Sequence, residues 1–151
     1  NEETVRQLKE KNLSGLDIEY TTESVAATAA KAHLAMVASG SATLQVASAG
    51  CPMVILYQSN PVLWYVAGRW LVKTRFLSLV NILAGRELVD EFMPYFLSVN
   101  PIWDRVRMLL LDKRQMVKIS KELAALVEPF TRENASQRTA ILVSKLLAEK
   151  G

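Results

Sequence analysis

The stretch LAMVASGSATLQVASAGCPMVILY at residues 34–57 decides the fold, because it contains two short apolar runs with a helical pattern between them. The runs LAMVA (34–38) and PMVILY (52–57) have the length and composition of buried strands. Small residues at 42–49 predict a helix between them, and Gly50 stands where a helix-capping glycine is preferred. The second run is apolar throughout, which is typical of a central parallel strand covered on both faces.

Upstream segments extend this alternation of helices and strands. Residues 2–12 have a helical pattern, and LDIEY at 16–20 alternates apolar and acidic residues as a half-exposed strand does. We expect the next helix to begin at Thr22 and to run to about His33. The predicted order is helix then strand, three times over, which indicates an α/β fold with an open parallel sheet.

After the second apolar run, the pattern becomes helical. Pro61 opens an apolar, aromatic segment that we expect to be a helix to about Lys73, followed by a short FLSLV segment. From about residue 101 onward the chain has helical patterns, with breaks expected near Pro129 and Asn134. The chain therefore divides into an α/β part and a helical end.

The composition is that of a globular protein of one domain. Half of the 151 residues are apolar and 22% are charged. The single cysteine, Cys51, excludes an internal disulfide and fits a reducing compartment such as the cytoplasm. With one cysteine and one histidine, His33, a zinc site is not expected. The sequence shows no signal peptide and no apolar run of the roughly 18 residues that span a membrane.

Positive charge is concentrated in the middle of the chain. Residues 1–60 contain four Lys or Arg against six Asp or Glu, whereas residues 61–118 contain nine against five. Such a surface suits anionic phosphates or an anionic membrane face, and no nucleic-acid partner is expected. The chain opens without Met on a helical pattern, so we expect it to be part of a longer protein.

Small polar residues follow the first apolar run. In open α/β sheets, ligands bind beyond the carboxyl ends of the strands, which is where Ser39, Gly40 and Ser41 are expected. Gly40 permits a tight turn, amides at the following helix start can face a phosphate, and Ser41 and Thr43 add hydroxyls. An ordinary turn with Ser as N-cap explains the same residues, and the loop alone favours that interpretation. Gln45 suits either a bound nucleoside or a solvated face.

Five small or polar residues interrupt the apolar segment SLVNILAGRELVDE (78–91): Asn81, Gly85, Arg86, Glu87 and Glu91. Asn81 offers an amide that both donates and accepts, and Arg86 offers a rigid fork of donors suited to phosphate. Glu87 and Glu91 share one face if the segment is helical. An amphipathic turn with ordinary surface charges explains the composition equally well.

Three segments together resemble the family of lipid-A-disaccharide synthases. They are ASGSATLQVASAGCPMVILY (38–57), WLVKTRFLSLVNILAGRELVDEF (70–92) and NASQRTAILVSKLL (134–147), within a resemblance over about residues 15–147. The pairing of SLxN with AGRE is its most specific part. The resemblance implies the C-terminal half of a GT-B glycosyltransferase. Residues 1–100 would form a Rossmann-like open parallel sheet without its first strand and loop, and helices at 101–151 would pack on it.

The resemblance also implies the substrates. The donor would be UDP-2,3-diacylglucosamine and the acceptor 2,3-diacylglucosamine 1-phosphate, giving the lipid A disaccharide and UDP. The UDP-sugar is a substrate, so no cofactor is implied, and we expect no metal requirement. The general base would belong to an N-terminal acceptor domain outside this chain. No catalytic residue is therefore assigned here, and the chain alone is not expected to turn over.

The family's substrate-binding positions carry over onto Ser39, Gly40, Ser41, Thr43, Gln45, Tyr57, Asn81, Gly85, Arg86, Glu87 and Glu91. By this resemblance, Arg86 and the 39–43 loop would neutralise the diphosphate, and Asn81 would orient the donor. The remaining positions would shape the site around these groups.

The chain departs from the family pattern at three positions. Gln45 stands where a glutamate usually accepts hydrogen bonds from the ribose hydroxyls, and Val80 and Asp90 replace prolines. An amide keeps one acceptor but loses the charge, so weaker UDP binding is expected. Two alternatives stay open. One is another GT-B enzyme of the UDP-GlcNAc type, against which SLxN and AGRE argue, and the other is a non-catalytic membrane- or partner-binding domain that kept the fold.

Acylated substrates imply an enzyme that is cytoplasmic and peripheral on the inner membrane. The residues expected to contact that membrane surface are Trp64, Tyr65, Arg69, Lys73 and Arg75, which combine aromatic rings with cations. A core helix packed on the sheet is the alternative, and it is favoured for Trp70. The run VRMLLL (106–111) is expected to serve helix packing. The other implied partner is the N-terminal acceptor domain, and a homo-oligomer stays open.

Overall fold

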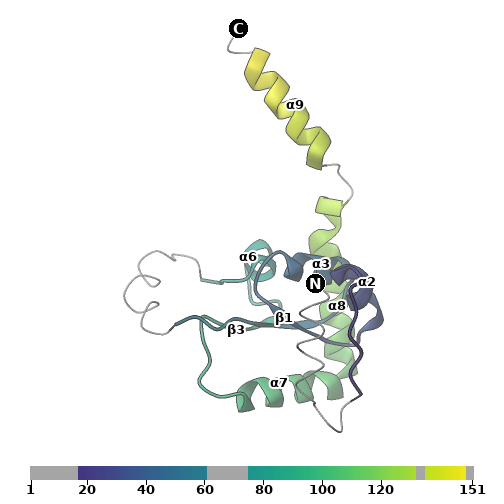
Figure 1. Ribbon diagram of the computed structural model, residues 1–151, viewed down its shortest axis with the longest axis vertical. Helices are drawn as coiled ribbons and strands as arrows, with labels where there is room; N and C mark the ends of the chain where they lie inside the picture. The colour runs from purple at the N-terminus through teal and green to yellow at the C-terminus, as the bar shows by residue number, and fades with distance from the viewer. Residues whose placement is uncertain (1–16, 61–74, 132–134, 149–151) are drawn as a thin grey trace.

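The computed structural model describes residues 17–60, 75–131 and 135–148 (Figure 1). The expected helices at 2–12 and 61–73 lie outside these ranges. The described elements follow in the order α2 Val25–Lys31, β1 Ala35–Ala38, α3 Ala42–Ser48, β2 Met53–Leu56, α6 Leu79–Ala84, β3 Asp90–Phe92, α7 Asn100–Leu111, α8 Lys113–Thr131 and α9 Ala135–Ala148.

The three described strands form one parallel sheet in the order β1-β2-β3. In its register, Val37 lies opposite Ile55, and Ile55 lies opposite Glu91. Helix α3 connects β1 to β2, and α6 precedes β3. The expected α/β class with an open parallel sheet is confirmed.

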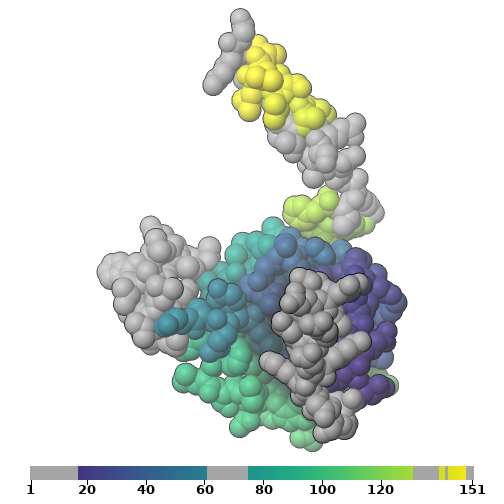
Figure 2. Space-filling view, viewed as in Figure 1, coloured from purple at the N-terminus to yellow at the C-terminus, as the bar shows by residue number. Residues whose placement is uncertain are grey.

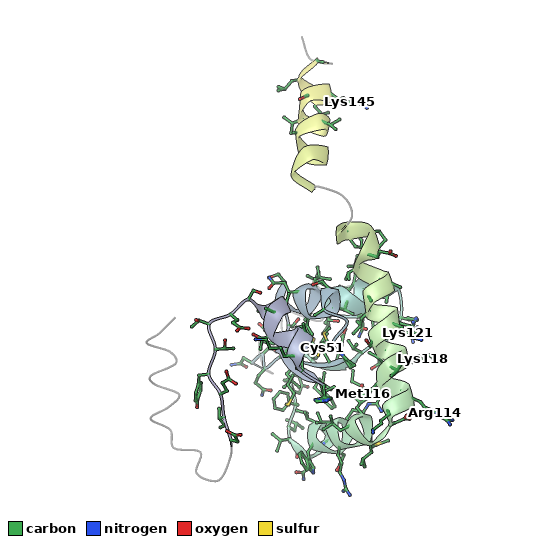
Figure 3. All side chains as sticks on the ribbon, turned by 90° about the vertical axis from the view of Figure 1, so that its right-hand side faces the viewer. Cys51, Arg114, Met116, Lys118, Lys121 and Lys145 are labelled. Carbon is green, nitrogen blue, oxygen red and sulfur yellow. The ribbon has the colours of Figure 1, made fainter. Side chains whose placement is uncertain are left out.

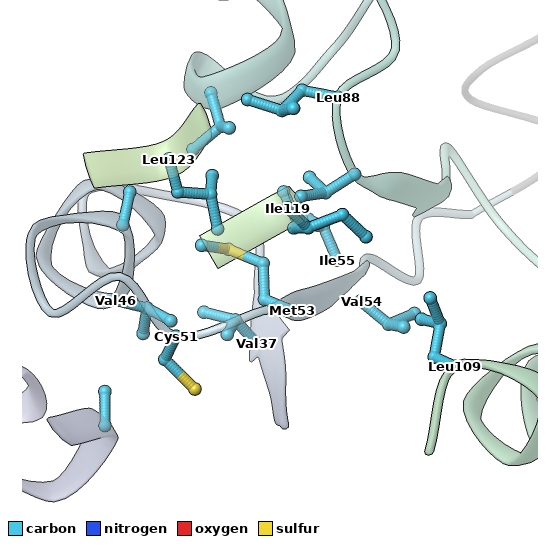
Figure 4. Packing of buried hydrophobic residues seen from close by; sticks show 14 of the residues in the cluster. Val37, Val46, Cys51, Met53, Val54, Ile55, Leu88, Leu109, Ile119 and Leu123 are labelled. Atoms are coloured by element: carbon cyan, nitrogen blue, oxygen red, sulfur yellow. The ribbon is translucent and has the colours of Figure 1, made fainter. Parts of the chain in front are cut away.

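Helices cover both faces of this sheet, α3, α6 and α8 on one and α7 on the other (Figure 1). Successive strand residues point to opposite faces, so Met53 and Ile55 lie on the side of Leu123, whereas Val54 points toward Leu109 of α7 (Figure 4). Met53, Val54 and Ile55 are at most 1% exposed. The prediction that the second apolar run is buried on both faces is therefore correct.

Two expectations about strands need correction. No strand forms over residues 17–20, where Asp17, Ile18 and Glu19 are exposed, so alternation without a neighbouring strand does not make one. The third described strand is instead β3, which is only three residues long, and two of these residues are acidic. Its sequence carries too little periodicity to be recognised by pattern.

Helix limits also differ from those expected. Helix α2 begins at Val25 rather than beside Thr22, because the Ser24 hydroxyl accepts a hydrogen bond from the Ala27 amide at 3.2 Å. Helix α8 continues through Pro129 to Thr131, so the break expected at that proline is displaced to the end of the helix. The proline removes one hydrogen bond, to a carbonyl of the preceding turn, and the helix ends two residues later.

The C-terminal helices behave differently from one another. Ile102 and Leu109 of α7 and Leu123 of α8 belong to the buried core. The run 106–111 packs through Val106 and Leu109, as expected, but exposes Met108, Leu110 and Leu111. Helix α9, yellow in Figures 1 and 2, extends away from the sheet and exposes Ile141, Val143, Leu146 and Leu147.

Gly50 lies just after α3 and against α8. It follows α3 with φ +64°, a left-handed conformation that favours glycine. A Cβ atom at this position would lie 3.3 Å from the Ser120 hydroxyl oxygen. The glycine expected to close the helix therefore also admits α8.

Replacing Gly50 with Ala is expected to lower the free energy of unfolding more than replacing Gly85 with Ala. The two glycines have φ of +64° and +65°, so both variants carry a strain of about 1 kcal/mol. Position 85 has open space around the added carbon, whereas position 50 faces Ser120. Urea unfolding of the two variants measures the difference.

A double-mutant cycle with Ser120→Ala tests the cause. If the Ser120 hydroxyl is responsible, the additional loss at Gly50 shrinks in the Ser120→Ala background, while the loss at Gly85 is unchanged. Equal losses for the two single glycine variants would contradict the packing argument.

Candidate functional site

The strands end together at one side of the sheet, here called the carboxyl edge, at Ala38, Leu56 and Phe92. The segments that follow are joined there by backbone hydrogen bonds. The Ser39 amide donates to the Leu56 carbonyl at 3.0 Å, and the Tyr57 amide donates to the Phe92 carbonyl at 3.2 Å. The carboxyl edge is where open α/β sheets bind ligands, and it brings together the 39–43 loop and Tyr57.

Thr43 fixes the conformation of the 39–43 loop. This threonine is fully buried, and its hydroxyl donates to the Gly40 carbonyl at 2.7 Å while its amide donates to the same oxygen at 3.1 Å. Gly40 has φ +152° and open space beside it. Among the described residues, the amides of Gly40, Ser41 and Ala42 donate to no backbone carbonyl. These donors therefore stay available to an anion.

Two further candidates lie beside the loop. Gln45 is exposed one turn into α3, and Tyr57 is 47% exposed directly after β2. Ser41 does not act as a side-chain N-cap for α3, which leaves its hydroxyl to solvent. Ser41 is thus the N-cap residue of α3 by position, and the interpretation of the loop as an ordinary turn stays open.

Glu91 organises the start of α6. Its carboxylate accepts the amides of Leu77 and Ser78 at 3.0 Å each, the Ser78 hydroxyl, and the Asn81 side-chain amide at 2.7 Å. The Ser78 hydroxyl oxygen in turn accepts the Asn81 backbone amide at 3.3 Å. One carboxylate thus joins β3 to the first turn of α6.

Asn81 completes this arrangement from the inside. Its side-chain amide nitrogen also donates to the Val89 carbonyl at 2.7 Å, and its oxygen accepts the Leu88 and Val89 amides at 2.8 and 3.0 Å. The residue is 0% exposed. Both hydrogens and both lone pairs of the amide are therefore used within the protein. Asn81 is therefore buried beneath the carboxyl edge. Its side chain fixes the backbone of Leu88 and Val89 and does not directly face a bound sugar nucleotide.

Arg86 lies at the other side of the sheet, the amino edge, where strands begin at Ala35, Met53 and Asp90. Helix α6 runs back from the carboxyl edge and is capped by Gly85. Gly85 and the following Arg86 therefore precede the start of β3. Arg86 pairs with Glu122 of α8, with Nη2 to Oε2 at 2.9 Å. The structure therefore places Arg86 and the 39–43 loop at opposite edges of the sheet. That both neutralise one diphosphate stays a prediction.

The two glutamates expected on one helix face are also separated. Glu87 is exposed in the turn that precedes β3, whereas Glu91 lies within β3. The segment 85–89 is not helical, because Gly85 ends α6 in the left-handed conformation with φ +65°.

A polar cavity of about 300 Å³ lies at the amino edge and was not anticipated from the sequence. It is lined by Arg86, Arg105, Lys118 and Gln115 together with Glu87, Asp90 and Glu122. Arg105 Nε donates to Asp90 Oδ1 at 2.7 Å. Lys118 continues outward into a basic row with Arg114 and Lys121 on one side of α8 (Figure 3). The three cations and three carboxylates of the lining balance, so the cavity has no excess charge for an anion.

Most of the expected membrane contacts lie outside the described residues: Trp64, Tyr65, Arg69 and Lys73. Arg75 is exposed, with its guanidinium carbon 5.4 Å from the centre of the Phe76 ring. Among the described ranges, no helix combines the length and apolar character needed to cross a bilayer. The same ranges contain no cluster of His, Cys, Asp and Glu able to hold a metal ion.

Cys51 has no catalytic environment in the described structure. It is 3% exposed, and burial raises the pKa of its thiol. Its sulfur lies 3.4 Å from the Pro52 carbonyl oxygen. These features fit the structural role expected for it.

Comparison with known proteins identifies the family. A model of the lipid-A-disaccharide synthetase family matches residues 1–146. The chain belongs to this family. Proteins called lipid-A-disaccharide synthase are similar to it: one from Enterobacter sp. strain 638 is 38% identical over 74% of the chain and 29% of the relative. One from Koribacter versatilis is 33% identical over 82% of the chain and 33% of the relative.

The chain spans about a third or less of these relatives. A synthase from Sulfurihydrogenibium sp. strain YO3AOP1 repeats the pattern, with 32% identity over 80% of the chain and 30% of the relative. The family segment SLVNILAGRELVDE has two structural parts here. Its ends, Ser78 and Glu91, meet at the carboxyl edge, and its centre, Gly85 and Arg86, joins the amino edge to α8.

Glu91→Gln is expected to lower the free energy of unfolding by about 2 kcal/mol, because a charged acceptor facing several donors becomes a neutral amide. Glu87→Gln is the matched control, since that side chain is exposed on the same segment. The control should stay within about 0.5 kcal/mol of the unsubstituted chain. Chemical unfolding measures both, and equally small changes would show that the Glu91 contacts do not stabilise the fold.

Arg86→Ala is expected to raise the pKa of Glu122. The Arg86 hydrogen bond chiefly holds the pKa of that carboxyl below its ordinary value, and Lys118 lowers the pKa less. Because the folded-state pKa is lowered, the stabilisation is present above the unfolded pKa and is lost as pH falls through the folded one. NMR titration of the Glu122 carboxyl carbon measures the shift. A larger change in Lys118→Ala than in Arg86→Ala would contradict this assignment.

Proposed function

We propose that this chain provides the donor site of a lipid-A-disaccharide synthase. The reaction is transfer of 2,3-diacylglucosamine from UDP to 2,3-diacylglucosamine 1-phosphate, with release of UDP. The observation that carries the proposal is the 39–43 loop at the carboxyl edge, where the amides of Gly40, Ser41 and Ala42 donate to no backbone carbonyl. Family membership gives this loop a substrate with a diphosphate.

The donor diphosphate lies against the amides of Gly40, Ser41 and Ala42, with the Ser39 and Ser41 hydroxyls as further donors. Hydrogen bonds to a charged acceptor are stronger than neutral ones, so backbone amides suffice to hold it. Gln45 accepts one ribose hydroxyl, and the exposed ring of Tyr57 borders the nucleoside. Thr43 acts through the loop, because its buried hydroxyl keeps the Gly40 carbonyl turned away from the anion.

The remaining family positions act as positioning residues. Asn81 and Glu91 hold the start of α6 and the 85–89 backbone, which sets the edge on which the donor lies. Gly85 and Arg86 anchor the same segment to α8, and Glu87 lies beside them in the amino-edge cavity. No residue of this chain is placed as the general base, which we assign to an acceptor domain of the longer protein.

The acylated substrates place the working enzyme on the cytoplasmic side of the inner membrane. Contact with that surface is assigned to Trp64, Tyr65, Arg69, Lys73 and Arg75, of which only Arg75 lies in the described structure. Its exposed guanidinium is compatible with anionic head groups. A non-catalytic domain that kept the fold is the competing proposal, and Gln45 is the residue that favours it.

UDP binding to this chain is expected to shift the NMR signals of the Gly40, Ser41 and Ala42 amides. Gln45→Glu should tighten UDP binding roughly three- to tenfold by restoring a charged acceptor for the ribose hydroxyls. Gln115→Glu is the control, because it adds the same charge at the amino-edge cavity and should leave UDP affinity unchanged.

Arg86→Ala serves as the third arm of the titration. If the diphosphate lies at the loop, this variant binds UDP as the unsubstituted chain does, because Arg86 is at the opposite edge. Loss of UDP binding in a folded Arg86→Ala chain would move the diphosphate to the amino edge. Absence of any shift up to millimolar UDP in every chain would favour the non-catalytic alternative.

A further inference from the structure

The pairing of β2 with β3 continues past the ends of both strands. The Tyr57 amide donates to the Phe92 carbonyl at 3.2 Å, and further on the Ser59 amide donates to the Pro94 carbonyl at 2.9 Å. The Ser59 hydroxyl donates to the same carbonyl oxygen at 2.8 Å. The two segments that leave the carboxyl edge therefore run side by side as far as Ser59 and Pro94.

The side chain of Gln58 extends this pairing. Its Oε1 accepts the Phe96 amide at 3.2 Å, and its Nε2 donates to the Phe96 carbonyl at 3.5 Å. The side-chain amide thus pairs with both backbone groups of one residue, as a neighbouring strand would. Gln58 and Ser59 are together called the clasp. The sequence did not indicate either residue, because their partners lie 38 and 35 residues further along the chain.

The clasp directly follows Tyr57, the residue that ends the run at 52–57. Strand residues alternate between faces, and Ile55 points to the face that α3, α6 and α8 cover (Figure 4). Tyr57 is two residues further on and shares the face of α3, which the 39–43 loop precedes. Gln58 faces the other way, toward the segment of Phe96 that leads into α7.

The clasp fixes backbone more than it stabilises the fold. Gln58 is exposed, so its hydrogen bonds replace bonds to water and add little to the free energy of unfolding. They do restrict the chain on the far side of Tyr57, while β2 restricts it on the near side. The Tyr57 ring is 47% exposed between these two fixed segments. A side chain that is already held in place loses less freedom when a ligand binds against it.

We propose that Gln58 and Ser59 are positioning residues that hold the Tyr57 ring against the nucleoside of the donor, an assignment that rests on the proposed function. They act through that ring, whereas the 39–43 loop holds the diphosphate. Loss of the clasp therefore weakens binding of a nucleoside diphosphate and leaves binding of a diphosphate without a nucleoside unchanged.

Three variants separate the clasp from a general loss of structure. Gln58→Met removes both bonds to Phe96 and keeps an unbranched side chain of similar length. Ser59→Ala removes the hydroxyl bond to Pro94, and Ser59→Thr keeps a hydroxyl at the same place. Gln115→Met is the matched control, because Gln115 lines the cavity at the amino edge. All four chains are expected to keep the urea unfolding midpoint of the unsubstituted chain.

Affinities for UDP and for inorganic pyrophosphate are measured by NMR titration of the Gly40 and Ser41 amides. Gln58→Met and Ser59→Ala are expected to weaken UDP binding about three- to tenfold, the range for ordering one side chain, and to change pyrophosphate binding less than about twofold. Ser59→Thr and Gln115→Met should bind both ligands as the unsubstituted chain does. An equal loss for UDP and pyrophosphate would overturn the inference.

A double-mutant cycle with Tyr57→Ala tests whether the clasp acts through the ring. The effect of Gln58→Met on UDP affinity is expected to disappear in the Tyr57→Ala background. An undiminished effect there would overturn the inference. Unchanged UDP affinity in both Gln58→Met and Ser59→Ala also overturns it and leaves the proposed function standing. Absence of UDP binding by every chain, the unsubstituted one included, overturns both.

Discussion

The contact between Glu91 and the first turn of α6 is the constraint on which the carboxyl edge depends. Helix α6 has six residues and β3 has three, and elements of these lengths have little stability of their own. The carboxylate satisfies amides that begin the helix, and Asn81 ties the same helix to the backbone before β3. These bonds add to the pairing of β3 with β2 and to the ion pair between Arg105 and Asp90.

This constraint explains why polar residues occupy the middle of an apolar segment. The Asn81 amide replaces backbone partners that the 85–89 turn lacks, because that turn is neither helix nor strand. Buried polar groups are tolerated when every donor and acceptor is satisfied, and those of Asn81 are. Asn81 and Glu91, two polar residues of the family segment that suggested ligand binding, here connect α6 to β3.

The sequence predicted the parts of the fold that depend on short-range patterns. The two apolar strands, the helix between them and the capping Gly50 follow from composition and spacing over residues 34–57. The pairing of polar side chains could not be predicted from such short-range patterns. Asn81 and Glu91 are ten residues apart, and Arg86 and Glu122 are 36 apart, so their pairing depends on how α6 and α8 fold back. For the same reason, β3 was missed and a strand was expected in exposed residues near Glu19.

The direction of the parallel strands separates two of the expected site regions. A loop after β1 and a turn before β3 lie at opposite edges of the sheet, so the 39–43 amides and the Arg86–Glu122 pair are on different edges. At the amino edge, Glu122 and Asp90 already oppose the charges of Arg86 and Arg105.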